Sequence, residues 1–265
     1  RTTTEEIRGE TEFIHHIEEH HIPVSAPYPS KEGIEFYQFE GRTQHYTVTV
    51  FKKIDGALPS TQDDPIDLTY KLGQTLGKMH IATQTFPRKE GDSPLRYSWG
   101  GQVWPYIEQY RAFELDPKPI DAFEKLARRV ENFSKAKSEY GMVHTDAQPE
   151  NYLVLSDKSI VIFDFDSCCY HWFLYDLAAA FMHSHEYFSL KGFDLTLEDL
   201  KTPLIRGYSE TYQPPNLIAM EDMIRLRAYT VFCWSSVQLA KGEEDPIGYN
   251  KIKSHQAWFQ RYIDL

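Results

Sequence analysis

The sequence lacks the features that mark secreted, membrane-spanning or disulfide-stabilised proteins. Its 265 residues include three cysteines, two of them adjacent, which supply neither a disulfide framework nor a metal-binding spacing. No run of about eighteen apolar residues is present, so no membrane span is expected. The N-terminus also has no apolar signal region, and these absences together predict a cytoplasmic location.

Positive charge is also scarce. The chain has 28 Lys and Arg against 39 Asp and Glu, and its net charge is −11. Without a basic stripe it is not expected to bind nucleic acid. The acidic balance permits a cationic partner but does not require one, because acidic surfaces also serve solubility. The hydrophobic content of 41% is enough for one bilobal domain or two small ones.

The most informative segment is HTDAQPEN at residues 144–151, followed by IFDFD at 162–166. Phosphoryl transfer from a nucleotide needs a carboxylate that orients and deprotonates the acceptor hydroxyl. It also needs an amide oxygen and a second carboxylate to hold the Mg²⁺ that bridges the phosphates. We therefore predict Asp146 as the catalytic base, and Asn151 and Asp164 as magnesium ligands.

Structural alternatives exist for each of these residues, because Asp and Asn are common in turns. The spacing from Asp146 to Asn151, together with an aspartate after an apolar strand, favours the catalytic interpretation. His144 is expected to brace the loop, since Asp146 already holds the position of the base. Asp166 could either neighbour the metal or support its ligands, and both roles stay open.

The surroundings predict short strands at 141–143, 152–155 and 160–163, with a polar turn at 156–159. The turn returns Asp164 to the loop that carries Asp146 and Asn151. We expect the three polar groups to meet at one end of a small sheet.

These residues resemble the aminoglycoside phosphotransferase and choline kinase family, which includes homoserine kinase type II. Members carry a loop close to HGDxHxxN, then IDFD, then a DLA helix start, and Asp176 begins DLA here. The resemblance extends from residue 1 to about residue 185. It implies an α+β, bilobal protein-kinase-like fold with a small N-terminal sheet lobe and a larger, mainly helical C-terminal lobe. Thr145 replaces the usual glycine and Gln148 a frequent histidine, which leaves the substrate open.

A helix is predicted over residues 2–21, with an apolar stripe from Ile7 to Ile17. In the family this helix supplies a glutamate that pairs with a strand lysine. Glu10 matches that position best and Glu6 second, although a solvated helix charge is the alternative. The glycine-rich loop and the lysine strand are expected to precede the first residue given, and no phosphate-binding lysine is assigned.

Strands are predicted at 34–39 and 46–51, and Asp55 and Gly56 then signal a turn. The resemblance implies an inter-lobe hinge here. It divides a nucleotide-binding lobe, residues 1–55, from a catalytic and substrate lobe, residues 56–265. Adenine would be read by backbone groups near Lys52 and Ile54.

Helices are predicted from residue 65 onward, at 120–137 and near 175–187, 196–212, 217–241 and 246–263. A loop with two glycines is expected to hold Tyr97, Trp99 and Trp104. Aromatic rings can cage a quaternary ammonium, but packing in the core is the favoured role for these residues and for Trp172 and Trp234.

The sequence thus predicts an ATP- and Mg²⁺-dependent kinase for a small-molecule hydroxyl: an amino alcohol, amino acid, aminoglycoside or sugar. A nucleotide-binding pseudokinase is the first alternative, because the lysine strand is not seen. A protein Ser/Thr kinase is disfavoured. Eleven residues separate Asp164 from Asp176, which is too short for a peptide-docking segment, and no Ala-Pro-Glu follows.

Overall fold

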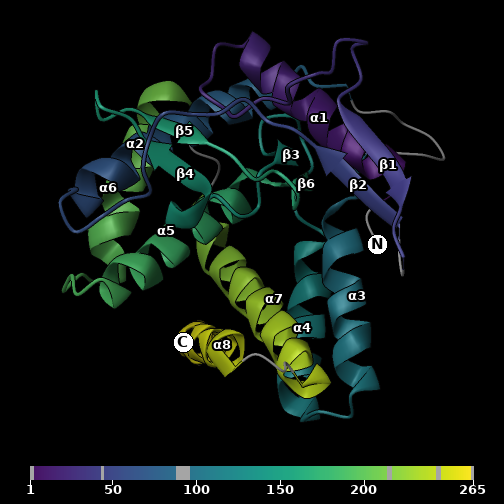
Figure 1. Ribbon diagram of the computed structural model, residues 1–265. Coiled ribbons are helices and arrows are strands. Elements are labelled where there is room, and N and C mark those ends of the chain that lie inside the picture. Colours follow the sequence, from purple (N-terminus) through teal and green to yellow (C-terminus); the bar gives the residue numbers. More distant parts are fainter. Residues whose placement is uncertain (1–2, 43–44, 88–95, 214–216, 243–245, 264–265) are drawn as a thin grey trace.

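The computed structural model describes residues 3–42, 45–87, 96–213, 217–242 and 246–263. One end of the molecule is formed by helix α1 (Thr4–Glu19) and the hairpin of β1 (Phe36–Glu40) and β2 (His45–Thr49). The other end is helical, and the short strands β3 to β6 lie between the two (Figure 1). No helix among these residues is long and apolar enough to cross a membrane.

Local sequence explains the N-terminal elements. Thr3 and Glu6 form a reciprocal capping box that starts α1, and Phe13, Ile14 and Ile17 are its fully buried stripe. Strands β1 and β2 pair antiparallel with Phe36 opposite Thr49. The predicted helix and both predicted strands are therefore confirmed to within two or three residues at each end.

The central strands form two small sheets, whereas one was predicted. Strand β4 (Tyr152–Val154) pairs with β5 (Ile160–Ile162) across the predicted polar turn. Strand β3 (Tyr140–Val143) instead pairs with β6 (Cys169–Trp172), a strand that the sequence analysis did not predict. An edge strand of four residues carries little periodic signal, and its partner lies far along the chain.

The helical part contains α2 (Pro65–Thr83), α4 (Pro117–Val130), α5 (Phe173–Leu190), α6 (Leu197–Thr211), α7 (Met220–Lys241) and α8 (Pro246–Ile263), with short 3-10 turns at Pro149–Asn151 and Leu217–Ala219. Helices α2 and α6 approach so closely that glycine is required between them. A Cβ atom on Gly73 would lie 2.1 Å from the carbonyl oxygen of Leu204. A Cβ on Gly207 would lie equally close to the carbonyl oxygen of Tyr70.

The predicted loop around Trp99 and Trp104 was wrong, because this segment is helix α3 (Trp99–Ala112). Two adjacent glycines and Pro105 argue locally against a helix, but burial of Val103 and Ile107 against the helical part overrides them. Trp99 is 3% exposed, and its ring centroid lies 5.2 Å from that of Trp172. These rings are core residues, as the favoured interpretation had it. The three cysteines are likewise buried and unpaired.

Candidate active site

The loop after β3 is fixed by the side chain of Asp176, which lies in the first turn of α5. Its fully buried carboxylate accepts the backbone N–H groups of Thr145 at 2.7 Å and of His144 at 3.3 Å. His80 of α2 contacts the same carboxylate through Nε2 at 3.0 Å. One buried anion therefore satisfies three donors and fixes the loop to two helices.

Thr145 adopts a left-handed backbone conformation with φ of 67°. This conformation favours glycine and strains a β-branched residue. Two contacts hold it, the N–H bond to Asp176 and a bond from its Oγ1 to the carbonyl oxygen of Ser167 at 2.9 Å. A threonine therefore occupies a glycine conformation at the cost of local strain.

His144 braces the loop, which agrees with its predicted role. Its Nε2 lies 3.0 Å from the carbonyl oxygen of Phe163, and its Nδ1 accepts the backbone N–H of Asp146 at 3.3 Å. The imidazole thereby links the Asp146 loop to the strand end that precedes Asp164.

The carboxylate of Asp146 is surrounded by donors. Asn151 donates its side-chain amide to Oδ2 at 3.0 Å and to the Asp146 carbonyl at 2.9 Å, and Gln148 also donates to Oδ2 at 3.0 Å. Arg227 of α7 reaches Oδ1 at 2.5 Å. Burial is the largest single influence and raises the pKa of Asp146, but the charge and hydrogen bond of Arg227 act together with His183 and His144 and outweigh it. The pKa is therefore lowered and the group stays ionised.

Asp164 follows β5 in a left-handed conformation with φ of 65°. Burial, followed by the charge of Asp166, raises its pKa, and Asp146 adds to the effect. Three carboxylates thus converge, and among the described residues no lysine or arginine forms an ion pair with Asp164. Because the amide nitrogen of Asn151 is used by Asp146, its oxygen is left for another ligand. This donor set fits a hard divalent cation such as Mg²⁺.

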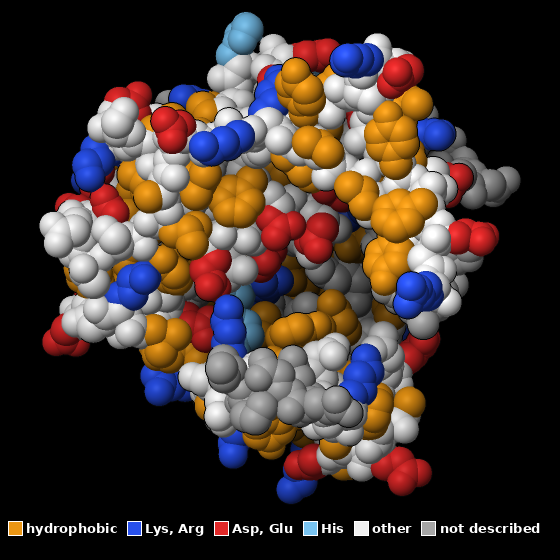
Figure 2. Space-filling model, viewed as in Figure 1, with side chains coloured by type: hydrophobic (Ala, Val, Ile, Leu, Met, Phe, Trp, Pro, Cys, Tyr) orange, Lys and Arg blue, Asp and Glu red, His pale blue; other side chains and the backbone are white. Residues whose placement is uncertain are grey.

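A pocket of about 440 Å³ opens beside these groups. Its walls are apolar, from Phe51, Ile54, Leu153 and Phe163, and one end is acidic; the remaining lining residues are Glu10, Ser25, Asp164 and Asp166. Figure 2 shows this face hollowed at its centre, with acidic side chains gathered at the hollow. This shape suits a nucleotide whose flat base lies between the apolar walls and whose phosphates point toward a cation held at the acidic end.

Two of the three residues predicted to contact the nucleotide, Glu10 and Ile54, line this pocket. Lys52 does not. Its side chain pairs with Glu18, its N–H donates to the Ala26 carbonyl, and its own carbonyl accepts from Ser25. With both backbone groups occupied, the geometry gives no support to the predicted contact of Lys52 with adenine.

Glu10 faces the acidic end of the pocket. Burial raises its pKa to about 7, with Arg96 opposing the shift and Asp166 and Asp164 adding to it. Arg96 lies 3.9 Å from its carboxylate and is 1% exposed. The three N–H sites of Arg96 donate to the carbonyls of Cys168, Glu6 and Asp166. This buried arginine joins α1 to the 164–168 segment and was not anticipated from the sequence.

A second cavity of about 320 Å³ adjoins the first at Asp166. Besides Asp166 it is lined by Glu6, Arg96, Tyr97, Gly101, Gln102, Pro105 and Tyr106. The amide oxygen of Gln102 is buried there without a hydrogen-bond partner. Two carboxylates and two tyrosines make this cavity suited to a ligand with N–H or O–H donors.

Arg227 and His183 were also missed. Arg227 lies 81 residues beyond Asp146, on a helix without a marked apolar stripe, and His183 lies inside the mostly apolar α5. Neither residue belongs to a local motif, so only the packing of α5 and α7 against the loop reveals them.

A phosphotransferase is the class of protein that this fold and site indicate. The chain belongs to the Phosphotransferase enzyme family, whose model matches residues 1–213. The predicted family and the predicted class of enzyme are therefore confirmed.

Curated relatives carry kinase names. Amicoumacin kinase of Bacillus subtilis (strain 168) is 25% identical over 242 residues, which cover 88% of this chain and 70% of the relative. Homoserine kinase of Methylobacillus flagellatus is 25% identical over 188 residues, which cover 67% of this chain and 52% of the relative. The chain thus spans about half the length of this homoserine kinase.

Solved structures share the fold. Amicoumacin kinase hAmiN, in complex with AMP-PNP, Ca²⁺ and Ami, gives a TM-score of 0.81 at 20% identity and covers 100% of this chain and 78% of that one. The microcompartment-associated aminopropanol kinase gives 0.72 at 19% identity, over 99% and 82%. Choline kinase LicA from Streptococcus pneumoniae gives 0.61 at 15%, over 97% and 79%. The α+β, bilobal prediction is confirmed by these likenesses.

Proposed function

We propose that the protein transfers the γ-phosphoryl group of ATP to a hydroxyl of a small molecule. The observation that carries this proposal is the convergence of Asp146, Asn151 and Asp164 beside a pocket with apolar walls and an acidic end. The family membership agrees with it. The lobe boundary near residue 55 remains part of the same proposal.

In the proposed reaction Asp146 accepts the proton of the acceptor hydroxyl as its oxygen attacks the γ-phosphorus. The bond to the β-phosphate oxygen breaks, and ADP leaves with that electron pair. Asn151 and Asp164 would hold Mg²⁺, which supplies charge neutralisation at the phosphates when bound. Ile54 and the other apolar residues of the pocket would hold the adenine base, and Glu10 would lie at the end of the pocket that takes the phosphates.

We assign the amine-bearing part of the acceptor to the second cavity, which shares Asp166 with the nucleotide pocket but is not lined by Asp146. The hydroxyl of the acceptor would extend from this cavity toward Asp146. The carboxylates of this cavity, from Glu6 and Asp166, favour an acceptor that also carries an amine. The names of the relatives, amicoumacin kinase and aminopropanol kinase, point the same way. An amino alcohol or an amino-bearing natural product is therefore the acceptor class we favour.

The test is an acceptor screen with full-length protein, Mg²⁺ and γ-labelled ATP. The panel holds 1-amino-2-propanol, L-homoserine, choline, amicoumacin, an aminoglycoside, a simple sugar and generic protein substrates. Phosphorylation of an amine-bearing small molecule, lost in Asp146→Asn, is expected. Labelling of the proteins alone, or nucleotide binding with no transfer to any acceptor, would contradict the proposal.

A further inference from the structure

A buried chain of polar groups leads away from Asp146, and we call Arg227, His183 and Glu186 the Arg227 network. Arg227, on α7, is 8% exposed and donates from Nη2 to Oδ1 of Asp146 at 2.5 Å. Behind it lies His183 of α5, whose Nε2 is 3.0 Å from Nε and 2.6 Å from Nη2 of the arginine. Glu186 stands one turn farther along α5.

The protonation of His183 follows from its neighbours. Arginine offers donors and no acceptor, so Nε2 of His183 must carry a lone pair. The neutral ring then holds its proton on Nδ1, which faces Oε2 of Glu186 at 3.8 Å, beyond hydrogen-bond distance, and has no hydrogen-bond partner among the described residues. Burial, and then the charge of Arg227, lowers the pKa of His183 to about 4, so the ring is neutral near pH 7.

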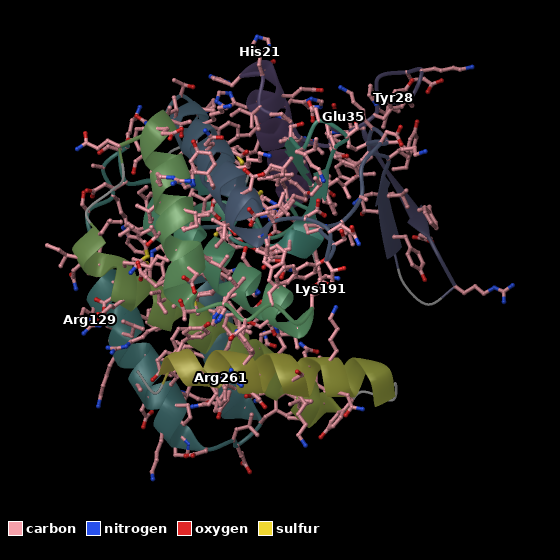
Figure 3. The ribbon with its side chains drawn as sticks, turned by 90° about the vertical axis from the view of Figure 1, so that its left-hand side faces the viewer. His21, Tyr28, Glu35, Arg129, Lys191 and Arg261 are labelled. Carbon is pink, nitrogen blue, oxygen red and sulfur yellow. The ribbon has the colours of Figure 1, made fainter. Side chains whose placement is uncertain are left out.

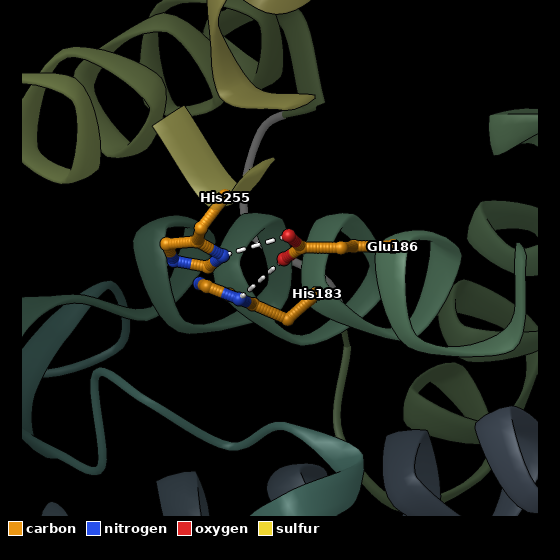
Figure 4. A group of neighbouring side chains, drawn as sticks. All are labelled: His183, Glu186 and His255. Carbon is orange, nitrogen blue, oxygen red and sulfur yellow. Dashed lines mark hydrogen bonds and ion pairs between the residues drawn. The ribbon is translucent and has the colours of Figure 1, made fainter. Parts of the chain in front are cut away.

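Glu186 ends the chain as a shared acceptor. His255 of α8 contacts its Oε1 through Nδ1 at 2.7 Å (Figure 4). Burial is the largest single influence and raises the pKa of Glu186, but its contacts with His183 and His255 together outweigh burial and lower the pKa to about 2. The network thus joins α5, α7 and α8 to the catalytic loop.

The same histidines and glutamate bring three potential metal-ligand atoms within 4.8 Å of one another. A metal on Nδ1 of His183 would place the ring proton on Nε2, against two N–H groups of Arg227. The guanidinium charge would also repel the cation. The donor chemistry therefore argues against a metal ion bound by these three side chains.

We propose that Arg227, oriented by His183 and Glu186, is a positioning residue that holds the carboxylate of Asp146 toward the acceptor hydroxyl. This inference rests on the proposed function. A guanidinium beside a base weakens the base, so charge alone would make its removal neutral or favourable for the rate. Positioning predicts the opposite, because a displacement of about 1 Å at the reacting groups costs about 10²-fold in rate.

The kinetic test compares Arg227→Met, Arg227→Lys and Glu186→Gln with wild type, on the panel acceptor that wild type phosphorylates fastest. Arg227→Met should lower kcat by about 10²-fold while the KM for ATP stays within about twofold. Arg227→Lys keeps the charge but lacks the planar guanidinium that hydrogen-bonds Asp146 and His183 at the same time, so an intermediate loss of kcat is expected. Glu186→Gln should give a smaller loss of the same kind.

The matched control is Arg129→Met, which breaks an exposed ion pair between α4 and Asp222 of α7 at the edge of the molecule (Figure 3). It should leave kcat unchanged. Thermal unfolding of each variant identifies loss of fold. A kcat of folded Arg227→Met within about threefold of wild type would overturn the inference.

A second readout needs no acceptor. In ¹⁵N-histidine NMR of the full chain, His183, assigned by its absence in His183→Gln, should be the neutral Nδ1–H tautomer. In Arg227→Met it should shift toward Nε2–H. A protonated or Nε2–H ring in wild type would overturn the inference. Wild type that phosphorylates nothing on the panel, but shows the expected tautomer, would instead reject the proposed function.

Discussion

Single residues of the 144–151 loop are held by side chains from three helices. Asp176 of α5 fixes the backbone at Thr145, His80 of α2 supports Asp176, and Arg227 of α7 reaches the Asp146 carboxylate. This arrangement separates residues that hold the site from residues that would do its chemistry. Substitutions can therefore test the two groups independently.

Asp146→Asn should lose phosphoryl transfer by about 10²–10⁴-fold while it still binds nucleotide, because the base acts on the acceptor and not on ATP. Initial rates and isothermal titration with a non-hydrolysable ATP analogue measure the two effects. Asp157→Asn, in the exposed turn between β4 and β5, is the control with the same chemical change. Near-normal turnover in Asp146→Asn would remove this residue from the catalytic role.

Asp164→Ala should abolish Mg²⁺-dependent nucleotide binding together with activity, since magnesium demands oxygen ligands in near-octahedral geometry. Asn151→Ala removes a neutral ligand and should show a milder form of the same defect. Titration of nucleotide with and without Mg²⁺ measures it. A magnesium dependence equal to that of wild type would show that Asp164 is not a ligand.

At the scale of secondary-structure elements, the close packing of α2 against α6 in the helical part depends on glycine. Gly73 and Gly207 let the two backbones touch, and His80 and Tyr208 from the same pair of helices hydrogen-bond at 2.8 Å. Through His80 this contact also supports Asp176 and, with it, the 144–151 loop. A substitution that separates α2 from α6 should therefore also disturb the 144–151 loop.

Gly73→Ala should destabilise the protein by roughly 2–3 kcal/mol or more, because the new Cβ would overlap a backbone carbonyl that cannot move alone. Chemical denaturation measures the loss. Gly100→Ala of α3 is the contrast, since its Cβ would meet only the Trp104 side chain, at 3.2 Å. Equal stability of the two variants would show that the α2–α6 approach is looser than described.

At the scale of the whole molecule, buried titratable groups link stability to pH. His183 has a pKa lowered from 6.5 to about 4 in the folded protein, so the unfolded chain binds its proton more readily. Its contribution to stability is present above pH 6.5 and is lost as the pH falls toward 4. The pKa of Glu186 is lowered from 4.5 to about 2, so its contribution to stability is lost as the pH falls from 4.5 toward 2.

Between pH 6.5 and pH 4 His183 should therefore make stability fall with falling pH, by up to about 1.4 kcal/mol per pH unit, while Glu10, with its pKa raised to about 7, acts in the opposite direction between pH 7 and pH 4.5. His183→Gln should remove that share of the slope, whatever its effect on absolute stability. Denaturation midpoints across this range measure it. His21→Asn, at the exposed outer end of α1 (Figure 3), is the control. An unchanged slope in His183→Gln would place the acid sensitivity elsewhere.

Much of the fold was predictable because its signals are local. The capping box of α1, the alternation in β2 and the periodicity of α2, α6 and α8 each lie within one stretch of chain. Asp146, Asn151 and Asp164 could be predicted as site residues for the same reason, because they lie in one short stretch around the β4–β5 hairpin. Their chemical types and spacing together point to phosphoryl transfer.

What tertiary structure decided depends on contacts between distant segments. Packing made a helix of the Gly100–Gly101 segment, and pairing of β3 with β6 split the expected sheet. The Arg227 network and Arg96 are buried charges whose partners come from other elements. A buried charge is tolerated only where hydrogen bonds and opposite charges from several segments compensate its desolvation, so no local sequence pattern predicts it.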